Sequence, residues 1–201
     1  MAKEYSADFL EQLKLIVEER DIIGAIRLLE DLHPADIADL VDEMDTEDAE
    51  FVLKVLDDQT AAGVLVEMED ESRHDMLEHM DSEDIAKHLE NLDTDDAVDL
   101  IQELDEEDRQ EVIASMDDME QAGEIIDLMR YDEDTAGGVM GTEMVVVNEN
   151  WSMPECVEQM RIQAEDKDEI YNVYVVDDDN VLQGVLPIRK LITHTSAAKI
   201  K

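Results

Sequence analysis

Several residue types are scarce in this 201-residue chain, and each shortage excludes a class of protein. The single cysteine, Cys156, excludes an intrachain disulfide and suits a reducing compartment. The N-terminus lacks the apolar segment of a signal peptide, and no stretch approaches the roughly 18 uninterrupted apolar residues of a membrane span. We therefore expect the chain itself to be soluble.

Basic residues are also scarce: the chain has 15 lysines and arginines but 57 aspartates and glutamates, which gives a formal charge of -42. Only four bases lie between residues 27 and 130, namely Lys54, Arg73, Lys87 and Arg109. Such a chain should repel nucleic acid and anionic membranes, since affinity for both comes from lysine and arginine. It should attract cations or a basic partner. An acidic surface that only keeps the protein soluble in salt is the alternative.

Apolar residues, by contrast, recur with a period of twelve. The beat positions of this repeat are Leu32, Met44, Leu56, Met68, Met80, Leu92, Leu104 and Met116. Eight and nine residues after each beat up to Leu104 comes an apolar pair, such as Val64/Leu65, and only His88 breaks this rule. Twelve residues carry a continuous helix about 120° past a whole number of turns. The beat positions of one long helix would therefore never share a face.

The chain must break once per repeat, and acidic openings after the beats supply the break. Examples are Asp45-Thr46-Glu47-Asp48 and Asp105-Glu106-Glu107-Asp108. Aspartate, serine and threonine favour helix N-caps, and acids in the first turn complement the helix dipole. Each repeat is thus predicted to be a helix of about two turns followed by a tight turn. Such helices must stack on their neighbours, which predicts a compact α-solenoid.

Two further helices are predicted before the repeats. The first should share one apolar stripe, made of Phe9, Leu10, Leu13, Ile16 and Val17. The second, capped by Asp21, should carry its apolar residues on Ile22, Ile23, Ile26 and Leu29. Both helices are assigned to the first domain, residues 1–131, and residues 132–140 are predicted to form a junction.

Residues 141–201 predict a small β-α-β-β-α unit. Its strands are expected at residues 144–147, 170–176 and 181–186, and Asp177-Asp178-Asp179-Asn180 is expected to be a hairpin turn. The intervening helix is expected to carry Val157, Met160 and Ile162, with Cys156 as a small core residue, and a last helix is expected at 188–192. So short a sheet normally needs a partner to cover its open side.

This order of segments resembles the cytosolic part of the MgtE family of magnesium transporters. The resemblance rests on the acidic repeats, on the junction Tyr131-Asp132-Glu133-Asp134-Thr135-Ala136-Gly137-Gly138-Val139-Met140, and on the hairpin residues 174–186. It implies a mainly α fold: a right-handed α-superhelical solenoid of 12-residue repeats (the N domain), followed by a small α/β half that matches the first CBS motif. The second CBS motif, the connecting helix and the transmembrane domain are missing, so this chain is expected to be truncated or incomplete and unable to conduct ions.

The resemblance implies a regulatory Mg2+ sensor at the cytoplasmic face of the cell membrane, homodimeric in the complete protein. In the family, Mg2+ bound between the N and CBS domains favours the closed gate. Clustered carboxylates repel one another, and a divalent cation relieves this repulsion, so ions stabilise the compact state. Several weak Mg2+ sites are expected, which Mn2+ or Ca2+ could also occupy, because Mg2+ keeps waters and needs few carboxylates per site.

The family's N-domain ligands fall on Asp95 and Asp99, and a junction glycine whose carbonyl binds an ion falls on Gly138. The i, i+4 spacing of the two aspartates places both carboxylates on one helix face. Alternatively, Asp95 only complements the helix dipole, Asp99 is merely exposed and Gly138 only forms a turn. A further acidic position of the family falls on Gly63, so that site is expected to be altered or absent.

Nucleotide binding is not expected from this CBS half. The Ser/Thr and Asp positions that bind nucleotides in CBS motifs are Pro187 and Lys190 here. No enzyme motif is found, and an enzyme is not predicted. Two rival functions stay open beside the sensor: an acidic α-solenoid scaffold for a basic protein partner, and low-affinity ion buffering at many equivalent sites.

Overall fold

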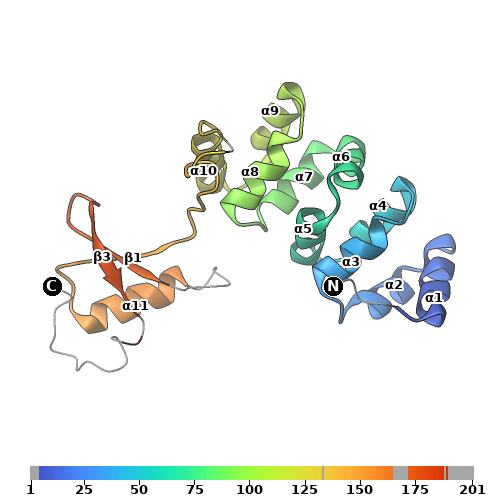
Figure 1. Ribbon diagram of the computed structural model, residues 1–201, viewed down its shortest axis with the longest axis horizontal. Coiled ribbons are helices and arrows are strands. Elements are labelled where there is room, and N and C mark those ends of the chain that lie inside the picture. Colours follow the sequence, from blue (N-terminus) through green and yellow to red (C-terminus); the bar gives the residue numbers. More distant parts are fainter. Residues whose placement is uncertain (1–4, 133, 165–171, 188, 190–201) are drawn as a thin grey trace. The chain divides into compact units, whose positions relative to one another are not determined.

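The computed structural model describes residues 5–132, 134–164, 172–187 and 189. The chain divides into two compact units, Met1–Met140 and Gly141–Lys201. In the first unit, short helices follow one another along a curved row from α1 to α10 (Figure 1). The second unit holds a small sheet with one helix against it (Figure 1). Among the described residues, no helix combines the length and the apolar character needed to cross a bilayer.

The first unit is built from helices of 8 to 12 residues. Their bounds are α1 Ala7–Glu18, α2 Ile22–Leu29, α3 Pro34–Val41, α4 Thr46–Val55, α5 Asp58–Glu67, α6 Asp70–His79, α7 Ser82–Leu89, α8 Thr94–Gln102, α9 Glu106–Ser115 and α10 Met119–Leu128. Helices of this length are marginal alone in water. The predicted solenoid of short helices is therefore confirmed, and its stability must come from packing between repeats.

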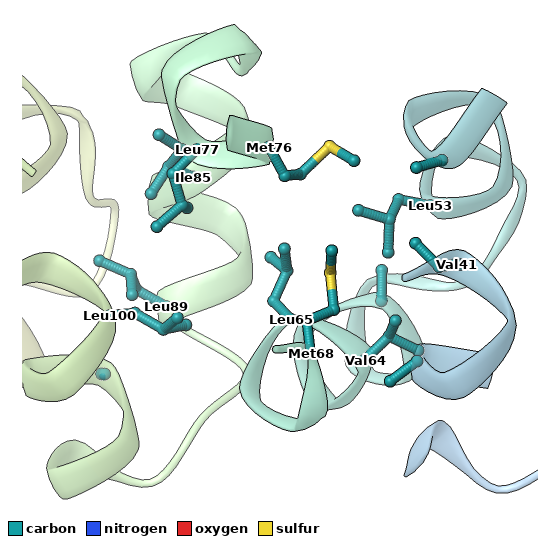
Figure 2. Packing of buried hydrophobic residues seen from close by; sticks show 14 of the residues in the cluster. Val41, Leu53, Val64, Leu65, Met68, Met76, Leu77, Ile85, Leu89 and Leu100 are labelled. Atoms are coloured by element: carbon teal, nitrogen blue, oxygen red, sulfur yellow. The ribbon is translucent and has the colours of Figure 1, made fainter. Parts of the chain in front are cut away.

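Helices two apart in the chain pack on each other: α3 on α5, α5 on α7, α7 on α9, α4 on α6 and α8 on α10. The apolar pairs form the core of this stack, with Val64 and Leu65 fully buried. Figure 2 shows side chains from successive helices meeting in this core, among them Leu53, Met76 and Leu89. Two consecutive repeats, 24 residues, therefore make one structural step of the solenoid.

The beat residues mark where helices end. Leu56, Met68, Met80 and Met116 are the C-caps of their helices, and each has an extended backbone. Their side chains turn back onto the core, where Met68 and Met116 are each 4% exposed. The period of twelve thus reflects one helix and one turn, as the repeat predicts.

Carboxylates cap the helices both within a repeat and between repeats. The Asp45 side chain accepts the backbone N–H of Asp48 at 3.0 Å, as the acidic openings predict. In addition, Asp42 accepts the N–H of Glu69 at 3.1 Å, and Glu90 accepts the N–H of Asp118 at 2.9 Å. These acids lie 27 and 28 residues before the N–H groups they bind. Part of the acidity therefore satisfies backbone donors at helix N-termini.

The predicted second helix is present as α2 with Asp21 as its N-cap, but of its four predicted apolar residues only Leu29 is buried. Ile22, Ile23 and Ile26 are 55%, 62% and 43% exposed, whereas Ala25 is fully buried and Leu29 is 1% exposed. The helix packs through Ala25 and Leu29, and Gly24 lies beside α1. A Cβ on Gly24 would come within 3.2 Å of the Ile16 side chain of α1, so only a small residue permits this approach. In α1 the stripe of Leu13, Ile16 and Val17 is buried as predicted, but Leu10 is 46% exposed.

The second unit contains β1 Val145–Asn148, α11 Met153–Gln163, β2 Val173–Val176 and β3 Leu182–Leu186. β1 pairs in parallel with β2, and β2 pairs antiparallel with β3. The predicted β-α-β-β order is thus present. Residues 170–171 of the predicted second strand lie outside the described part of the chain, as does the predicted helix at 188–192 apart from Arg189.

α11 packs on the core through Met153, Cys156 and the predicted Met160. The predicted Val157 is only half-buried. A capping box at Ser152 sets the start of this helix, and Ile162 is left 56% exposed. Burial raises the pKa of the Cys156 thiol to about 11. The thiol is thus protonated at neutral pH and serves as a small core group, in agreement with the sequence.

His88 on α7 stands where other repeats place a buried apolar residue. Its Nδ1 is buried and has no hydrogen-bond partner among the described residues. Burial lowers the pKa of His88 below its ordinary 6.5. A backbone hydrogen bond with Asp58 and the negative charges of Asp58 and Asp84 raise the pKa, but burial outweighs them. Protonation of this imidazole therefore favours the unfolded chain.

We predict that the wild-type chain loses stability relative to His88→Leu as the pH falls through 6.5 toward the folded pKa. The measurement is the thermal midpoint of the helical circular-dichroism signal of both chains between neutral and mildly acidic pH. His74→Gln is the control, because His74 is exposed and pairs only with Glu78 of its own helix. A pH-independent difference between wild type and His88→Leu would contradict the assignment.

Candidate divalent-cation site

α8 carries a stripe of carboxylates along one side. Asp95, Asp99 and Glu103 follow at intervals of four residues, from the first turn of the helix to its C-cap. The opposite side is fixed in the core by Ala97, Val98, Leu100 and Ile101, all buried. The rotation of α8 therefore brings the predicted pair Asp95 and Asp99 together on the outer side. Asp95 is half-buried, and Asp99 is exposed.

Arg73 of α6 neutralises one end of this stripe. Its Nε donates to Glu103 Oε1 at 2.7 Å, and its Nη1 donates to the carbonyl of Met68 at 3.1 Å. The positive charge also lowers the pKa of Asp99, although other causes outweigh it. Glu103 is thus paired, and Asp99 lies at the edge of the field of Arg73.

Arg109 of α9 occupies the equivalent place three repeats later. Its guanidinium donates to the carbonyls of Ile101 at 3.2 Å, Gln102 at 3.0 Å and Leu104 at 2.9 Å. Both arginines thus hold the turn before their own helix. Arg73 differs because it also bonds a carboxylate of another helix, which makes it part of the electrostatics of the α8 stripe.

Asp96 lies among like charges. Burial raises the pKa of the Asp96 carboxyl, and the charges of Asp95, Asp93, Asp99 and Glu67 raise it further. A carboxyl with a raised pKa is one whose surroundings disfavour its negative form. A divalent cation at this position would relieve the same unfavourable field that a proton relieves.

The pKa of the Asp99 carboxyl is raised as well, although a nearby positive charge opposes the rise. Burial raises the pKa of its carboxyl, the charge of Asp95 raises it further, and Arg73 opposes the rise. The two predicted ligands therefore repel each other across one helical turn. Oxygen-only ligands with net negative charge are the chemistry that Mg2+ and Ca2+ prefer.

Gly138 lies in a hydrogen-bonded turn of the junction. Its N–H donates to the carbonyl of Thr135 at 3.1 Å and to its Oγ1 at 3.2 Å. With the N–H occupied, the carbonyl oxygen is the polar group that Gly138 can offer to an ion. Within the described residues, Gly138 forms no hydrogen bond with either aspartate. Its role as a ligand stays a prediction, as does that of Asp95 and Asp99.

Gly63 of α5 has a packing role of its own. A Cβ at this position would lie 3.1 Å from Cγ of Pro34 on α3, closer than side chains normally approach. The missing side chain therefore lets α5 pack tightly on α3. A larger side chain here would require Pro34 to shift by a few tenths of an ångström.

Four charged residues of this region were missed by sequence reasoning, namely Glu67, Arg73, Asp96 and Glu103. The i, i+4 spacing that selected the two aspartates extends to Glu103 and could have found it. The scarcity of bases could have singled out Arg73. Glu67 belongs to α5, and only the packing of the solenoid brings its charge toward α8.

We predict that Asp99→Asn raises the thermal midpoint of the divalent-free chain by about 1–2 °C, the scale of a surface charge change in a chain of this size. The folded pKa lies above the unfolded one, so the ionised group opposes folding at neutral pH. The gain should vanish as the pH falls through the folded pKa, because the wild-type carboxyl is then protonated too.

The matched control is Asp39→Asn on α3. Asp39 is exposed and occupies the same repeat position as Asp99, five repeats earlier. It should leave the midpoint unchanged. Equal effects of the two substitutions would show that general repulsion is being measured, and not a local imbalance on α8.

Two sequence profiles match the chain: the MgtE intracellular N domain over residues 32–134 and the CBS domain over residues 136–196. Among curated proteins, the magnesium transporter MgtE of Enterococcus faecalis is 41% identical over 75 residues, which are 37% of this chain and 17% of that protein. The magnesium transporter MgtE of Thermus thermophilus is 45% identical over 69 residues, 34% of this chain and 15% of that protein. The matched part thus spans less than a fifth of these relatives.

Two solved structures are similar over nearly the whole chain. The crystal structure of the soluble part of a magnesium transporter has a TM-score of 0.80 at 28% identity, covering 96% of this chain and 76% of that one. The crystal structure of the cytosolic domain of the Mg2+ channel MgtE in complex with ATP has a TM-score of 0.85 at 32% identity, covering 95% of this chain and 78% of that one.

Proposed function

Because this chain belongs to the MgtE family, we propose that it is a regulatory Mg2+-sensing part of a magnesium transporter. The observation that carries the proposal is the carboxylate stripe of α8 with the neighbouring Asp96. The carboxyls of Asp96 and Asp99 have raised pKa values through burial and repulsion by nearby carboxylates. Asp95 and Asp99 supply carboxylate ligands in this proposal, and Gly138 supplies a carbonyl. Glu67 and Asp96 strengthen the negative field around them.

The mechanism follows from differential ion affinity. A cation can shift a conformational equilibrium only as far as it binds one state better than the other. In the proposal, the compact state gathers more oxygen ligands, with Mg2+ bound between the N and CBS domains. That state corresponds to the closed gate of the complete transporter. When Mg2+ is depleted, repulsion among the carboxylates separates the domains and releases the gate.

Arg73 limits how tightly the stripe binds an ion. Its charge offsets that of Glu103 and part of that of Asp99. Mg2+ keeps several of its waters and is bound through few carboxylates, so a partly neutralised stripe suits a weak site. A weak site is what a sensor of cellular Mg2+ needs, since it must be empty when the ion is scarce. Mn2+ and Ca2+, with similar oxygen chemistry, could occupy the same ligands.

The remaining partners follow from the family and from the open sheet. β3 leaves Leu182 and Val185 60% and 50% exposed, and a second CBS motif would cover such apolar groups. We propose that the complete protein adds that motif and a transmembrane domain, pairs as a homodimer, and holds this part at the cytoplasmic face of the membrane. No reaction is assigned to the carboxylate site.

Nucleotide binding is not part of the proposal for this half. One similar structure holds ATP, but Pro187 offers neither a side-chain hydroxyl nor a backbone N–H at the position where CBS motifs place Ser or Thr. Lys190, at the aspartate position, lies outside the described residues.

We predict that Mg2+ compacts the chain and that the effect saturates at low millimolar concentration. Small-angle scattering across a Mg2+ titration measures it, against NaCl at matched ionic strength, because screening alone would act equally in both series. The double variant Asp95→Asn/Asp99→Asn should lose most of the response, and Asp39→Asn should keep it. Equal responses to both salts would refute specific sensing by this chain.

A further inference from the structure

A groove of about 410 Å3 lies at the N-terminal end of the first unit, between α1 and the turn from α3 to α4. Its apolar lining consists of Leu10, Leu13, Val17, Leu40 and Met44. Its charged lining consists of Lys14, Glu18, Glu43, Asp45 and Asp48. The volume falls within the range of roughly 300–1,000 Å3 that is usual for ligand pockets.

The apolar floor of this groove is partly accessible. Met44 at its beat position is half-buried, as are Leu32, Leu56, Met80 and Leu92 at other beats. Leu10 of α1 borders the groove and is 46% exposed. α1, which forms one wall of the groove, thus leaves an apolar side chain accessible, and the groove can accept an apolar side chain from outside.

The charged lining of the groove is negative on balance, because it contains four carboxylates and one ammonium group. The ammonium Nζ of Lys14 lies 3.8 Å from Oε1 of Glu18. Asp48 is paired with Arg20 at 2.9 Å. Glu43 is exposed and forms no hydrogen bond or ion pair with any described residue. An occupant with apolar anchors and positive charge would therefore match both the floor and the rim.

We propose that this groove is a docking site for a basic amphipathic helix of a protein partner. Helices bind such grooves through apolar anchors spaced three and four residues apart, and flexible methionines such as Met44 adapt to varied anchors. A second copy of this chain is disfavoured at this groove, because its acidic surface would meet the four carboxylates of the lining. Nucleic acid and anionic lipid are repelled for the same reason.

This docking site is independent of Mg2+ sensing. α1 precedes residues 32–134, the part that matches the N-domain profile. None of the groove residues belongs to the α8 stripe. A failure of the Mg2+ experiments would therefore leave this inference standing, and the reverse also holds.

The test titrates the full chain into a fluorescently labelled 14-residue helical peptide of leucine and lysine, with leucines on one face, followed by anisotropy. Leu10→Gln should weaken binding by roughly fivefold or more, as the loss of an apolar anchor does. Leu15→Gln is the matched control, since Leu15 is on the same helix, is 53% exposed and does not line the groove. Glu43→Gln should also weaken binding, and Glu47→Gln, an exposed acid outside the groove, should not.

A peptide of the same composition, with leucines arranged so that no helical face is apolar, separates specific docking from attraction by net charge. Equal binding of the two peptides, or equal effects of Leu10→Gln and Leu15→Gln, would overturn the proposal. So would sedimentation that shows the chain alone self-associating through Leu10, which would assign the groove to a second copy. Variant folding is checked by circular dichroism, and the exposure of Leu10 makes loss of the fold unexpected.

Discussion

Repulsion among carboxylates is the constraint on which the rest of the structure depends. With 57 acids and 15 bases, each stable helix must place its negative charge where something positive meets it. Backbone N–H groups do this for Asp45, Asp42 and Glu90, and Arg73 does it for Glu103. Asp96 and Asp99 have too little such compensation, and their raised pKa values show it. The proposed ion site is the place where protein groups alone do not balance the charge.

Much of the fold could be predicted because the twelve-residue period conflicts with the helical period. That conflict requires a break in every repeat, and the acidic openings show where it falls. The face by which a short helix packs was harder to predict. α2 turns Ala25 and Leu29 inward and exposes Ile22 and Ile23, and Gly24 permits its close approach to α1. In α11, Cys156 and Met160 pack as predicted, but Ile162 is 56% exposed and Met153 takes part in the core instead.

The candidate site, too, could be predicted only in part. Spacing along one helix predicts that Asp95 and Asp99 share a face, since that depends only on helix geometry. The contributions of Arg73 and Glu67 could not be predicted, because they arise from α6 and α5 and require knowledge of how helices two apart stack. Gly138 was predicted as a ligand from the family resemblance alone. The turn at Gly138 engages its N–H, so that its carbonyl is the group that could bind an ion. The weak affinity proposed for the sensor rests on Arg73, which the sequence alone left without a role.

The most direct test of the central claim is a carboxyl-carbon NMR titration of Asp96 and Asp99, with and without Mg2+ at constant ionic strength. The account predicts that both pKa values lie above the ordinary aspartate value in the divalent-free chain and fall when Mg2+ is added. Ordinary pKa values at both aspartates, or raised values that ignore Mg2+, would contradict the claim that unbalanced carboxylates on α8 form the ion site.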